Sequence, residues 1–409
     1  MQHLLDKILH RLIVEGRLTV RWPDGKETTY GDGPGGSAGV ALKNRAIIRR
    51  LALNPSLAFG EGYMAGDIVP LDCSLFELMD VIVANVMAGS AGPLVMRLRN
   101  RLARLFRRLM QYNPAPRARR NAAHHYDLNG RLYSLFLDRD QQYSCAYFPH
   151  GDETIDAAQA AKKRHIAGKL LLTRPGLSVL DIGCGWGGLA LMLAREYGAR
   201  ALGVTLSSEQ LSSARARAAE AGLAGQVRFE LQDYRSLNEQ FDRIVSVGMF
   251  EHVGVNHYAA FFATIRRCLA PDGVALLHAI SRSDGPGVTN PWVDKYIFPG
   301  GYCPALSEVL PVIERAGLWV TDIEVLRLHY AETLARWRRR FLANRDTIAA
   351  LMDERFCRMW EFYLVGAELA FRREGHMVFQ IQIARSVHTV PLTRDYMFEA
   401  ERRAVRSLA

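Results

Sequence analysis

Strand-like and helix-like stretches alternate along the chain from residue 176 onward. Compact apolar runs bounded by glycine or polar residues predict strands at 178–183, 201–206, 227–233, 241–248 and 273–280. Apolar residues that recur with helical spacing predict helices at 188–198, 207–222 and 257–270. Alternation of this kind is typical of a parallel sheet covered by helices on both faces. This part of the chain is therefore predicted to be α/β, with a doubly wound sheet.

Two more strand patterns follow late in the sequence, at 319–326 and 377–384. The residues between them have helical spacing of apolar positions, and we predict a helical insert at 331–374. We expect this insert to interrupt the α/β part of the chain without ending it.

The N-terminal region has a mixed pattern and no catalytic motif. Its apolar residues begin at helical spacing, a strand-like stretch follows at 18–22, and a glycine-rich turn lies at 31–36. We predict a smaller α+β domain there. Prolines at 114 and 116 then break the chain and indicate a linker. The predicted boundaries are an N-terminal domain at 1–112, a linker at 113–123 and a second domain at 124–409.

A basic amphipathic helix is predicted at 94–110. Apolar residues at 94, 98, 102, 105 and 109 share one face, and the opposite face carries Arg97, Arg101, Arg104 and Arg108. Such a helix can lie on an anionic bilayer with its arginines among the phosphates, or it can pack on its own domain. Nucleic acid is disfavoured, because the stretch lacks interleaved aromatic residues that would stack on bases.

Composition narrows the classes of protein that fit. The 409 residues suffice for two or three domains, and a hydrophobic content of 49% allows a buried core. A net charge of +10 favours an anionic partner such as a membrane surface, a nucleic acid or an acidic substrate. We expect no spanning helix and no secretory leader. The six cysteines form no CxxC pair, so we expect a reduced, cytoplasmic protein without a metal site.

A glycine-rich loop follows the first strand of the α/β part and opens the next helix. It reads D-x-G-x-G-x-G from Asp181 through Gly183 and Gly185 to Gly187, and glycines let the backbone approach a ligand closely. The loop also contains the GxGxxG of dinucleotide-binding proteins. A dinucleotide site needs an acid at the end of the second strand, where this chain has Thr205. The leading Asp181 makes the loop similar to motif I of S-adenosylmethionine-dependent methyltransferases.

Seven stretches in order carry a closer resemblance. They are YSCAYF at 143–148, VLDIGCGWGG at 179–188, GVTLSSEQ at 203–210, LQDYR at 231–235, SVGMFEHVG at 246–254, LLHAI at 276–280 and KYIFPGG at 295–301. Through them the chain resembles the cyclopropane-fatty-acyl-phospholipid synthases and the mycolic acid cyclopropane synthases, strongly over 120–390 and weakly at 57–64. The resemblance implies a Rossmann-like class I methyltransferase domain, a doubly wound sheet with a late antiparallel strand, and a homodimer.

The resemblance also implies which residues contact the cofactor. The glycine loop would cradle the amino-acid part of S-adenosylmethionine, and Asp233 would lie by the adenine. Trp186 would either cover the sulfonium or be a packed aromatic residue. The residues predicted to bind the cofactor are Tyr143, Ser144, Asp181, Gly183, Gly185, Trp186, Gly187, Thr205, Leu206, Ser207, Gln210, Asp233 and Tyr234.

The chemistry of cyclopropanation requires a second group of residues, which hold the base near the reacting carbon atoms. Attack of an alkene on the sulfonium methyl creates a carbocation, and ring closure then needs a base that removes a proton from the new methyl. Water must be excluded because it would trap the cation. In the family this base is a bound bicarbonate. The resemblance implies that it is held by Cys145, Glu251, His278, the backbone of Ile280 and Tyr330.

Each of these residues also has a plainer interpretation. Cys145 can be a small buried apolar residue, and Glu251 can simply begin a helix. His278 lies in an apolar strand, where a histidine is often part of the core. Tyr330 lies in a stretch that matches the family more loosely.

The predicted function is transfer of a methylene group from S-adenosylmethionine to the cis double bond of unsaturated phospholipid acyl chains, at the inner face of a membrane. Two alternatives remain: methylation of the alkene to a methyl-branched or methylene fatty acid, and a lipid-binding protein with a degenerate methyltransferase domain. The chain departs from some family members late in the insert. Ala367 stands where they have cysteine, and Glu368 places an acid in an apolar helical stretch.

Overall fold

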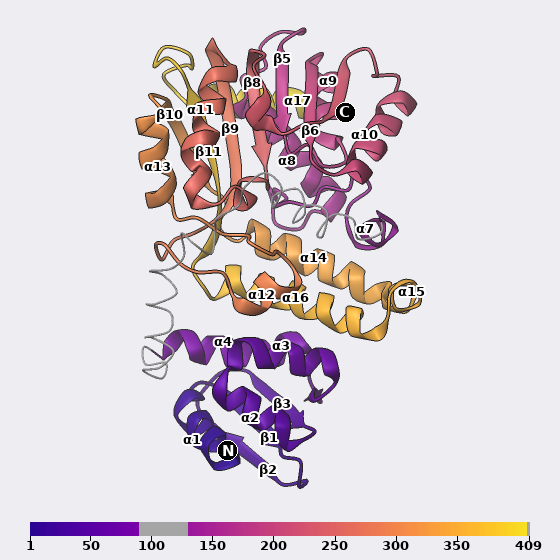
Figure 1. Cartoon of the computed structure of the whole chain (residues 1–409), viewed down its shortest axis with the longest axis vertical. Helices are drawn as coiled ribbons and strands as arrows, with labels where there is room; N and C mark the ends of the chain where they lie inside the picture. Colours follow the sequence, from indigo (N-terminus) through magenta and orange to yellow (C-terminus); the bar gives the residue numbers. More distant parts are fainter. Residues whose placement is uncertain (90–129, 407–409) are drawn as a thin grey trace. The chain divides into compact units, whose positions relative to one another are not determined.

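The computed structural model describes residues 1–89 and 130–406 (Figure 1). The predicted basic helix at 94–110 and the predicted linker at 113–123 lie outside the described residues.

The described residues form two compact units, and neither unit is a continuous stretch of chain. The first unit contains 1–89, 288–299 and 334–375. The second unit contains 130–287, 300–333 and 376–406.

The second unit is built on a seven-stranded sheet in the order β10-β11-β9-β8-β5-β6-β7. Its strands are β5 (Ser178–Ile182), β6 (Arg200–Thr205), β7 (Val227–Leu231), β8 (Phe241–Val247), β9 (Leu269–Arg282), β10 (Trp319–Val325) and β11 (His376–Ala384). The strands from β5 to β9 pair in parallel, whereas β11 runs antiparallel to both β9 and β10. The predicted doubly wound sheet with a late antiparallel strand is confirmed.

Helices cover both faces of this sheet (Figure 1). One face packs against α8 (Ile155–Lys169), α9 (Gly188–Tyr197) and α10 (Ser208–Glu220), and the other packs against α11 (Tyr258–Cys268) and α13 (Leu306–Arg315). Successive side chains of a strand point to opposite faces, so Val179 and Leu180 of β5 enter different cores. The remaining elements are α7 (Gly130–Phe136), η1 (Tyr234–Ser236), η2 (Phe250–His252), η3 (Val255–His257) and α17 (Asp395–Arg406), which packs on α8.

The first unit has a four-stranded sheet in the order β2-β1-β3-β4. Its strands are β1 (Arg17–Arg21), β2 (Glu27–Tyr30), β3 (Ser37–Leu42) and β4 (Ile68–Leu71). Its N-terminal helices are α1 (Gln2–Leu12), α2 (Arg45–Leu53), α3 (Pro55–Ala65) and α4 (Leu75–Ala88). Apolar residues of these helices and strands share one core, which confirms the predicted α+β fold.

The predicted insert is helical and packs within the first unit. It contains α15 (Arg345–Leu351), α16 (Glu354–Arg372) and most of α14 (His329–Ala343), while 288–299 supplies α12 (Pro291–Tyr296). The Phe362 ring of α16 meets Trp292 of α12 edge to face at 4.6 Å. The hydroxyl of Tyr63 in α3 donates to Glu361 of α16 at 2.9 Å. Residues far apart in sequence thus complete the N-terminal unit.

Glu368 of α16 is buried between two arginines. Its carboxylate accepts hydrogen bonds from Nε of Arg338 at 3.1 Å and from Nε of Arg372 at 2.9 Å. A buried carboxylate requires such partners. The acid that stood out in the apolar pattern therefore joins α14 to α16. Within the described residues, no helix combines the length and apolar character needed to span a membrane.

Candidate active site

A cavity lies at the carboxyl ends of β5, β6 and β8, the edge at which parallel sheets bind ligands. The glycine loop, the ends of neighbouring strands and residues 141–144 line it. Of the residues predicted to bind the cofactor, only Gly187 is not part of this wall. The structure thus gathers on the cavity Tyr143, Ser144, Asp181, Gly183, Gly185, Trp186, Thr205, Leu206, Ser207, Gln210, Asp233 and Tyr234.

The glycines of the loop share one backbone requirement. Gly183, Gly185 and Gly187 have φ of 81°, 54° and 82°, in the left-handed region that favours glycine. A Cβ on Gly187 would also lie 2.5 Å from a ring carbon of Phe229. The backbone therefore favours glycine at all three positions, and packing against that ring favours it at 187 as well.

Asp181 ends β5 as a buried carboxyl on the cavity wall. Burial raises its pKa to about 7, with the charge of Lys162 opposing the shift. A buried acid with a raised pKa suits a ligand that brings its own positive charge. The amino group of an amino acid is such a ligand group.

The ends of β6 and β7 form polar corners of the cavity. Ser207 caps α10 by accepting the N–H of Gln210 at 3.2 Å, and the Thr205 hydroxyl donates to Oε1 of Gln210 at 2.9 Å. Because its oxygen is engaged, Gln210 presents its amide NH2 as a donor. Asp233 lines the cavity while its carboxylate accepts a hydrogen bond from Nε of Arg235 at 2.9 Å.

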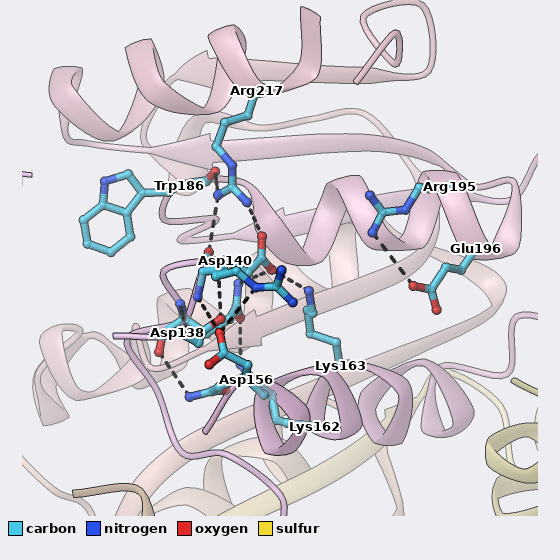
Figure 2. Close-up of polar contacts among 12 residues, drawn as sticks. Asp138, Asp140, Asp156, Lys162, Lys163, Trp186, Arg195, Glu196 and Arg217 are labelled. Atoms are coloured by element: carbon cyan, nitrogen blue, oxygen red, sulfur yellow. Dashed lines mark hydrogen bonds and ion pairs between the residues drawn. The ribbon is translucent and has the colours of Figure 1, made fainter. Parts of the chain in front are cut away.

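Residues 141–144, which we call the roof segment, line this cavity. Charges anchor Asp140, the residue directly before this segment (Figure 2). The Asp140 carboxylate pairs with Lys163 of α8 and with Arg217 of α10. Arg217 also donates through Nη1 to the carbonyl of Trp186 at 2.7 Å. One guanidinium therefore ties the roof segment to the glycine loop. A Cβ on Gly188 would lie 2.6 Å from Cγ of Asp140, so this glycine makes room for the anchor.

Lys162 of α8 supports the roof segment from inside the protein. Its ammonium donates to Oε1 of Gln142 at 2.8 Å and to Oγ of Ser144 at 2.9 Å. Burial lowers its pKa to about 8, while the charge of Asp138 opposes the shift. Asp138 accepts the N–H groups of Asp140 at 3.0 Å and Gln142 at 2.8 Å (Figure 2).

Trp186 is a packed aromatic residue: its buried ring lies 5.2 Å from Tyr133. The residue also lines the cavity, and its role as a cover over the sulfonium stays a prediction. His252 is a lining residue that the sequence did not single out, and burial lowers its pKa to about 4.

Glu251 and Ile280, both predicted to hold the anion, are in direct contact. The Ile280 N–H donates to Oε1 of Glu251 at 2.6 Å, so this backbone donor is engaged by a protein group. Oε2 of Glu251 is buried and has no partner among the described residues. Burial raises the Glu251 pKa to about 7. An unsatisfied buried acceptor is costly, and a ligand O–H would satisfy it.

His278 and Cys145 are buried and neutral. Burial, followed by the charges of Lys162 and Lys169, lowers the pKa of His278 well below its usual value. Burial raises the pKa of the Cys145 thiol, opposed by the charge of Lys162. The charge of Lys162 thus acts on both predicted site residues.

Tyr330 lies buried in the first turn of α14. One turn further, Thr333 accepts the N–H of Ala146 at 3.0 Å, which ties α14 to the segment that carries Cys145. Across the described chain, no group of three or more acidic, histidine or cysteine side chains is arranged to hold a metal ion.

Comparison with known proteins identifies the family of this chain. The family model for mycolic acid cyclopropane synthetase matches residues 114–381. The chain belongs to this family. It is an S-adenosylmethionine-dependent methyltransferase, and the NAD interpretation of the glycine loop is wrong. A second family model, for a domain of unknown function, matches residues 4–88.

Several curated relatives extend over most of the chain. The cyclopropane-fatty-acyl-phospholipid synthase of Escherichia coli strain K12 is 40% identical over 86% of this chain and 88% of its own length. The tuberculostearic acid methyltransferase UfaA1 of Mycobacterium tuberculosis is 36% identical over 93% of this chain and 91% of its own length.

Solved structures support the fold over about two thirds of the chain. Mycolic acid cyclopropane synthase CmaA1, crystallised with SAH and CTAB, matches with a TM-score of 0.62 at 34% identity. The match covers 67% of this chain and 99% of that one. The cyclopropane synthase MmaA2 from Mycobacterium tuberculosis also gives a TM-score of 0.62 at 34% identity, over 66% of this chain and 99% of its own.

Proposed function

We propose that the protein transfers a methylene group from S-adenosylmethionine to the cis double bond of unsaturated phospholipid acyl chains. The observation that carries this proposal is the buried carboxylate of Glu251, whose Oε2 lacks a partner in the described structure. A methyl transfer that ends in ring closure needs a held base, and this acceptor can hold one. The 40% identity to a cyclopropane-fatty-acyl-phospholipid synthase supports the same substrate.

The reaction balances without an oxidant or a metal. The alkene π electrons form a bond to the sulfonium methyl carbon, and the carbon–sulfur bond breaks to leave S-adenosylhomocysteine. The acyl chain then carries a cation. Loss of a proton from the added methyl supplies the electron pair that closes the ring.

The protein's part is to exclude nucleophiles and to position the reacting groups. A thiol with a raised pKa stays protonated, so Cys145 does not capture the cation. Burial of Glu251 and His278 keeps bulk water away.

The residues present fit a small oxyacid anion such as bicarbonate. Oε2 of Glu251 can accept its O–H, and the imidazole of His278 can donate to an anionic oxygen. A bicarbonate held by these groups and by Cys145 and Tyr330 would supply the base.

A second product has support from the comparisons. The relative named tuberculostearic acid methyltransferase covers 93% of this chain. Loss of a proton from a chain carbon instead of the new methyl would give a methylated alkene. Which product forms depends on whether the base lies closer to a proton of the added methyl or to a proton of a chain carbon.

The product assay distinguishes these outcomes. Purified protein is incubated with S-adenosylmethionine, bicarbonate and vesicles of unsaturated anionic phospholipid. High-field cyclopropane proton signals with loss of the olefin would support the proposal, whereas retained olefin with a new methyl would favour the second product. Glu251→Gln is the control: it should lose product while binding cofactor as before. No gain of CH2 by the wild type would contradict both.

We also propose that the protein acts as a cytoplasmic, peripheral membrane enzyme and as a homodimer. The net charge of +10 supports attraction to anionic lipid. Reversing the charges of Arg97, Arg101, Arg104 and Arg108 should abolish binding to anionic vesicles, and unchanged binding would contradict this role. Light scattering at several concentrations tests the dimer.

A further inference from the structure

A line of buried hydrogen bonds leads from His278 to the ammonium of Lys169, all within the second unit. Nε2 of Gln380 lies 3.1 Å from Nδ1 of His278. Nζ of Lys169 lies 2.6 Å from Oε1 of the same glutamine side chain. The three side chains come from β9, β11 and α8, and all are at least 98% buried.

The partners dictate the direction of every hydrogen bond along this line. An ammonium only donates, so Oε1 of Gln380 must be the acceptor from Lys169. The amide nitrogen Nε2 then faces His278, and an amide nitrogen only donates. Nδ1 of His278 must accept and therefore carries no proton. We propose that Lys169 and Gln380 fix His278 as the neutral tautomer with its proton on Nε2.

Lys169 is itself held in place from two sides. Its ammonium pairs with Glu324 of β10, and its carbonyl accepts a hydrogen bond from Nε2 of Gln382 at 2.5 Å. Burial works against ionisation of Glu324, but hydrogen bonds and charges from His165 and Lys169 lower its pKa to about 2. Glu324 is therefore a carboxylate, and its charge and hydrogen bond oppose the lowering of the Lys169 pKa by burial.

His165 in the same network shows the opposite protonation. Nε2 lies 2.6 Å from Glu324, and Nδ1 lies 2.6 Å from Glu401. Burial alone would lower its pKa, but the hydrogen bonds to these two acids outweigh burial and raise it. Carboxylates only accept, so both ring nitrogens must donate and His165 is an imidazolium. The neighbouring charges of Lys162, Lys169 and His165 favour a neutral His278, and Glu324 opposes them.

The tautomer decides what His278 can do. Nδ1 is engaged by Gln380, and among the described residues Nε2 has no hydrogen-bond partner. With its proton on Nε2, the ring offers an N–H to an anion and has no free lone pair for taking a proton. His278 is thus a donor and not the base, while Gln380 and Lys169 are positioning residues. This inference rests on the proposed function, which places an anion beside His278.

Nitrogen NMR tests the tautomer without any turnover. In full-length protein with labelled histidine side chains, long-range 1H–15N correlation separates protonated ring nitrogens from those with a lone pair. We assign His278 by its loss in His278→Gln. We expect one protonated nitrogen, Nε2, for His278, and two for His165 as an internal reference. A proton on Nδ1 of His278, or on both nitrogens at neutral pH, would overturn the proposal.

An isosteric variant on β11 tests the cause. In Gln380→Glu a carboxylate faces Nδ1 and can only accept, so the proton should appear on Nδ1. Gln232→Glu is the control for the added charge, since Gln232 follows β7 at the other edge of the sheet and donates to Oγ of Ser236 at 3.1 Å. It should leave the His278 signals unchanged.

Two variants of Lys169 provide a second test of the cause in case Gln380→Glu does not fold. Lys169→Met removes the ammonium and should give a mixture of tautomers, whereas Lys169→Arg should retain the single one. Unchanged signals in both Gln380→Glu and Lys169→Met would overturn the assigned cause.

Activity separates this inference from the proposed function. Gln380→Glu should lower product formation by at least about tenfold, the lower end of the range for partners that orient metal-binding histidines, with unchanged affinity for cofactor. If the wild type forms no product while its NMR signals are as expected, the proposed function fails and the tautomer assignment stands.

Discussion

At the scale of single residues, Asp181 predicts how cofactor binding depends on pH. Burial raises its pKa to about 7, and a bound cationic amino group would favour the carboxylate. Protons therefore compete with the cofactor. Its affinity should be constant above pH 7 and fall by about tenfold per pH unit below it. Calorimetry across pH, in buffers with different ionisation enthalpies, measures both the affinity and the proton released.

Asp181→Asn provides the control for this dependence. The amide cannot titrate, so the variant should bind weakly at every pH and release no proton. A wild type whose affinity is flat from pH 5.5 to 8 would show that Asp181 does not meet the amino group.

The sequence could bring these local residues together on one cavity for a physical reason. Asp181, Thr205 and Asp233 each lie at or just beyond the carboxyl end of a parallel strand, and these ends meet at one edge of the sheet. Lys162 and Gln380 were not predicted, because α8 and β11 bring them to the site through tertiary packing. The one local signal was the run of basic residues in α8, which a helix packed on a sheet would normally avoid.

At the scale of elements, Arg217 is expected to support cofactor binding although it does not line the cavity. It pairs with Asp140, directly before the roof segment, and donates to the carbonyl of Trp186. Arg217→Met should release the roof segment from α10 and weaken binding of S-adenosylmethionine by about tenfold. Arg195→Met is the matched control. Arg195 lies on the neighbouring α9, is more exposed, and is 3.9 Å from Glu196 (Figure 2). We expect no change of affinity there, and equal effects of the two variants would contradict the anchor.

Glu368 predicts the stability of the helical insert. Removing a buried carboxylate leaves Arg338 and Arg372 to find other partners, although both can reach water. Glu368→Ala should therefore lower the free energy of unfolding by about 2–3 kcal/mol, below the upper range for buried ion pairs. Denaturant unfolding followed by circular dichroism measures it.

Glu354 on the same helix is the control for this measurement. It pairs with Arg345 and Arg358 at the surface, where ion pairs contribute little. Glu354→Ala should change the free energy of unfolding by less than about 1 kcal/mol. A similar loss in both variants would show that burial of Glu368 is not the cause.

At the scale of the whole molecule, the composition of the two units determines which fragments of the chain can fold on their own. The core that joins Tyr63, Leu75 and Met79 to Val365 and Leu369 is built from both ends of the sequence. A fragment of residues 124–409 should expose the apolar face of α16, bind a hydrophobic dye and aggregate. Co-expression with residues 1–112 should restore solubility. A monomeric, dye-free fragment would contradict the shared core.

The sequence could not have indicated this division. Glycine and proline signals mark where a chain turns, and they led to boundaries near 112 and 124. Which surface the insert covers depends on side chains such as Phe362 and Trp292 that meet only in the folded unit. Periodicity predicts that a helix has an apolar face but not the partner of that face.

The place of β11 between β9 and β10 also constrains the order in which the protein can fold during its synthesis. In the described sheet β10 pairs only with β11, which leaves the ribosome after it. Until His376–Ala384 emerge, β10 is unpaired and so is one edge of β9, and such edges are templates for aggregation. A premature stop codon before residue 376 would therefore do more harm than the short missing tail suggests, because it removes the strand that closes the sheet.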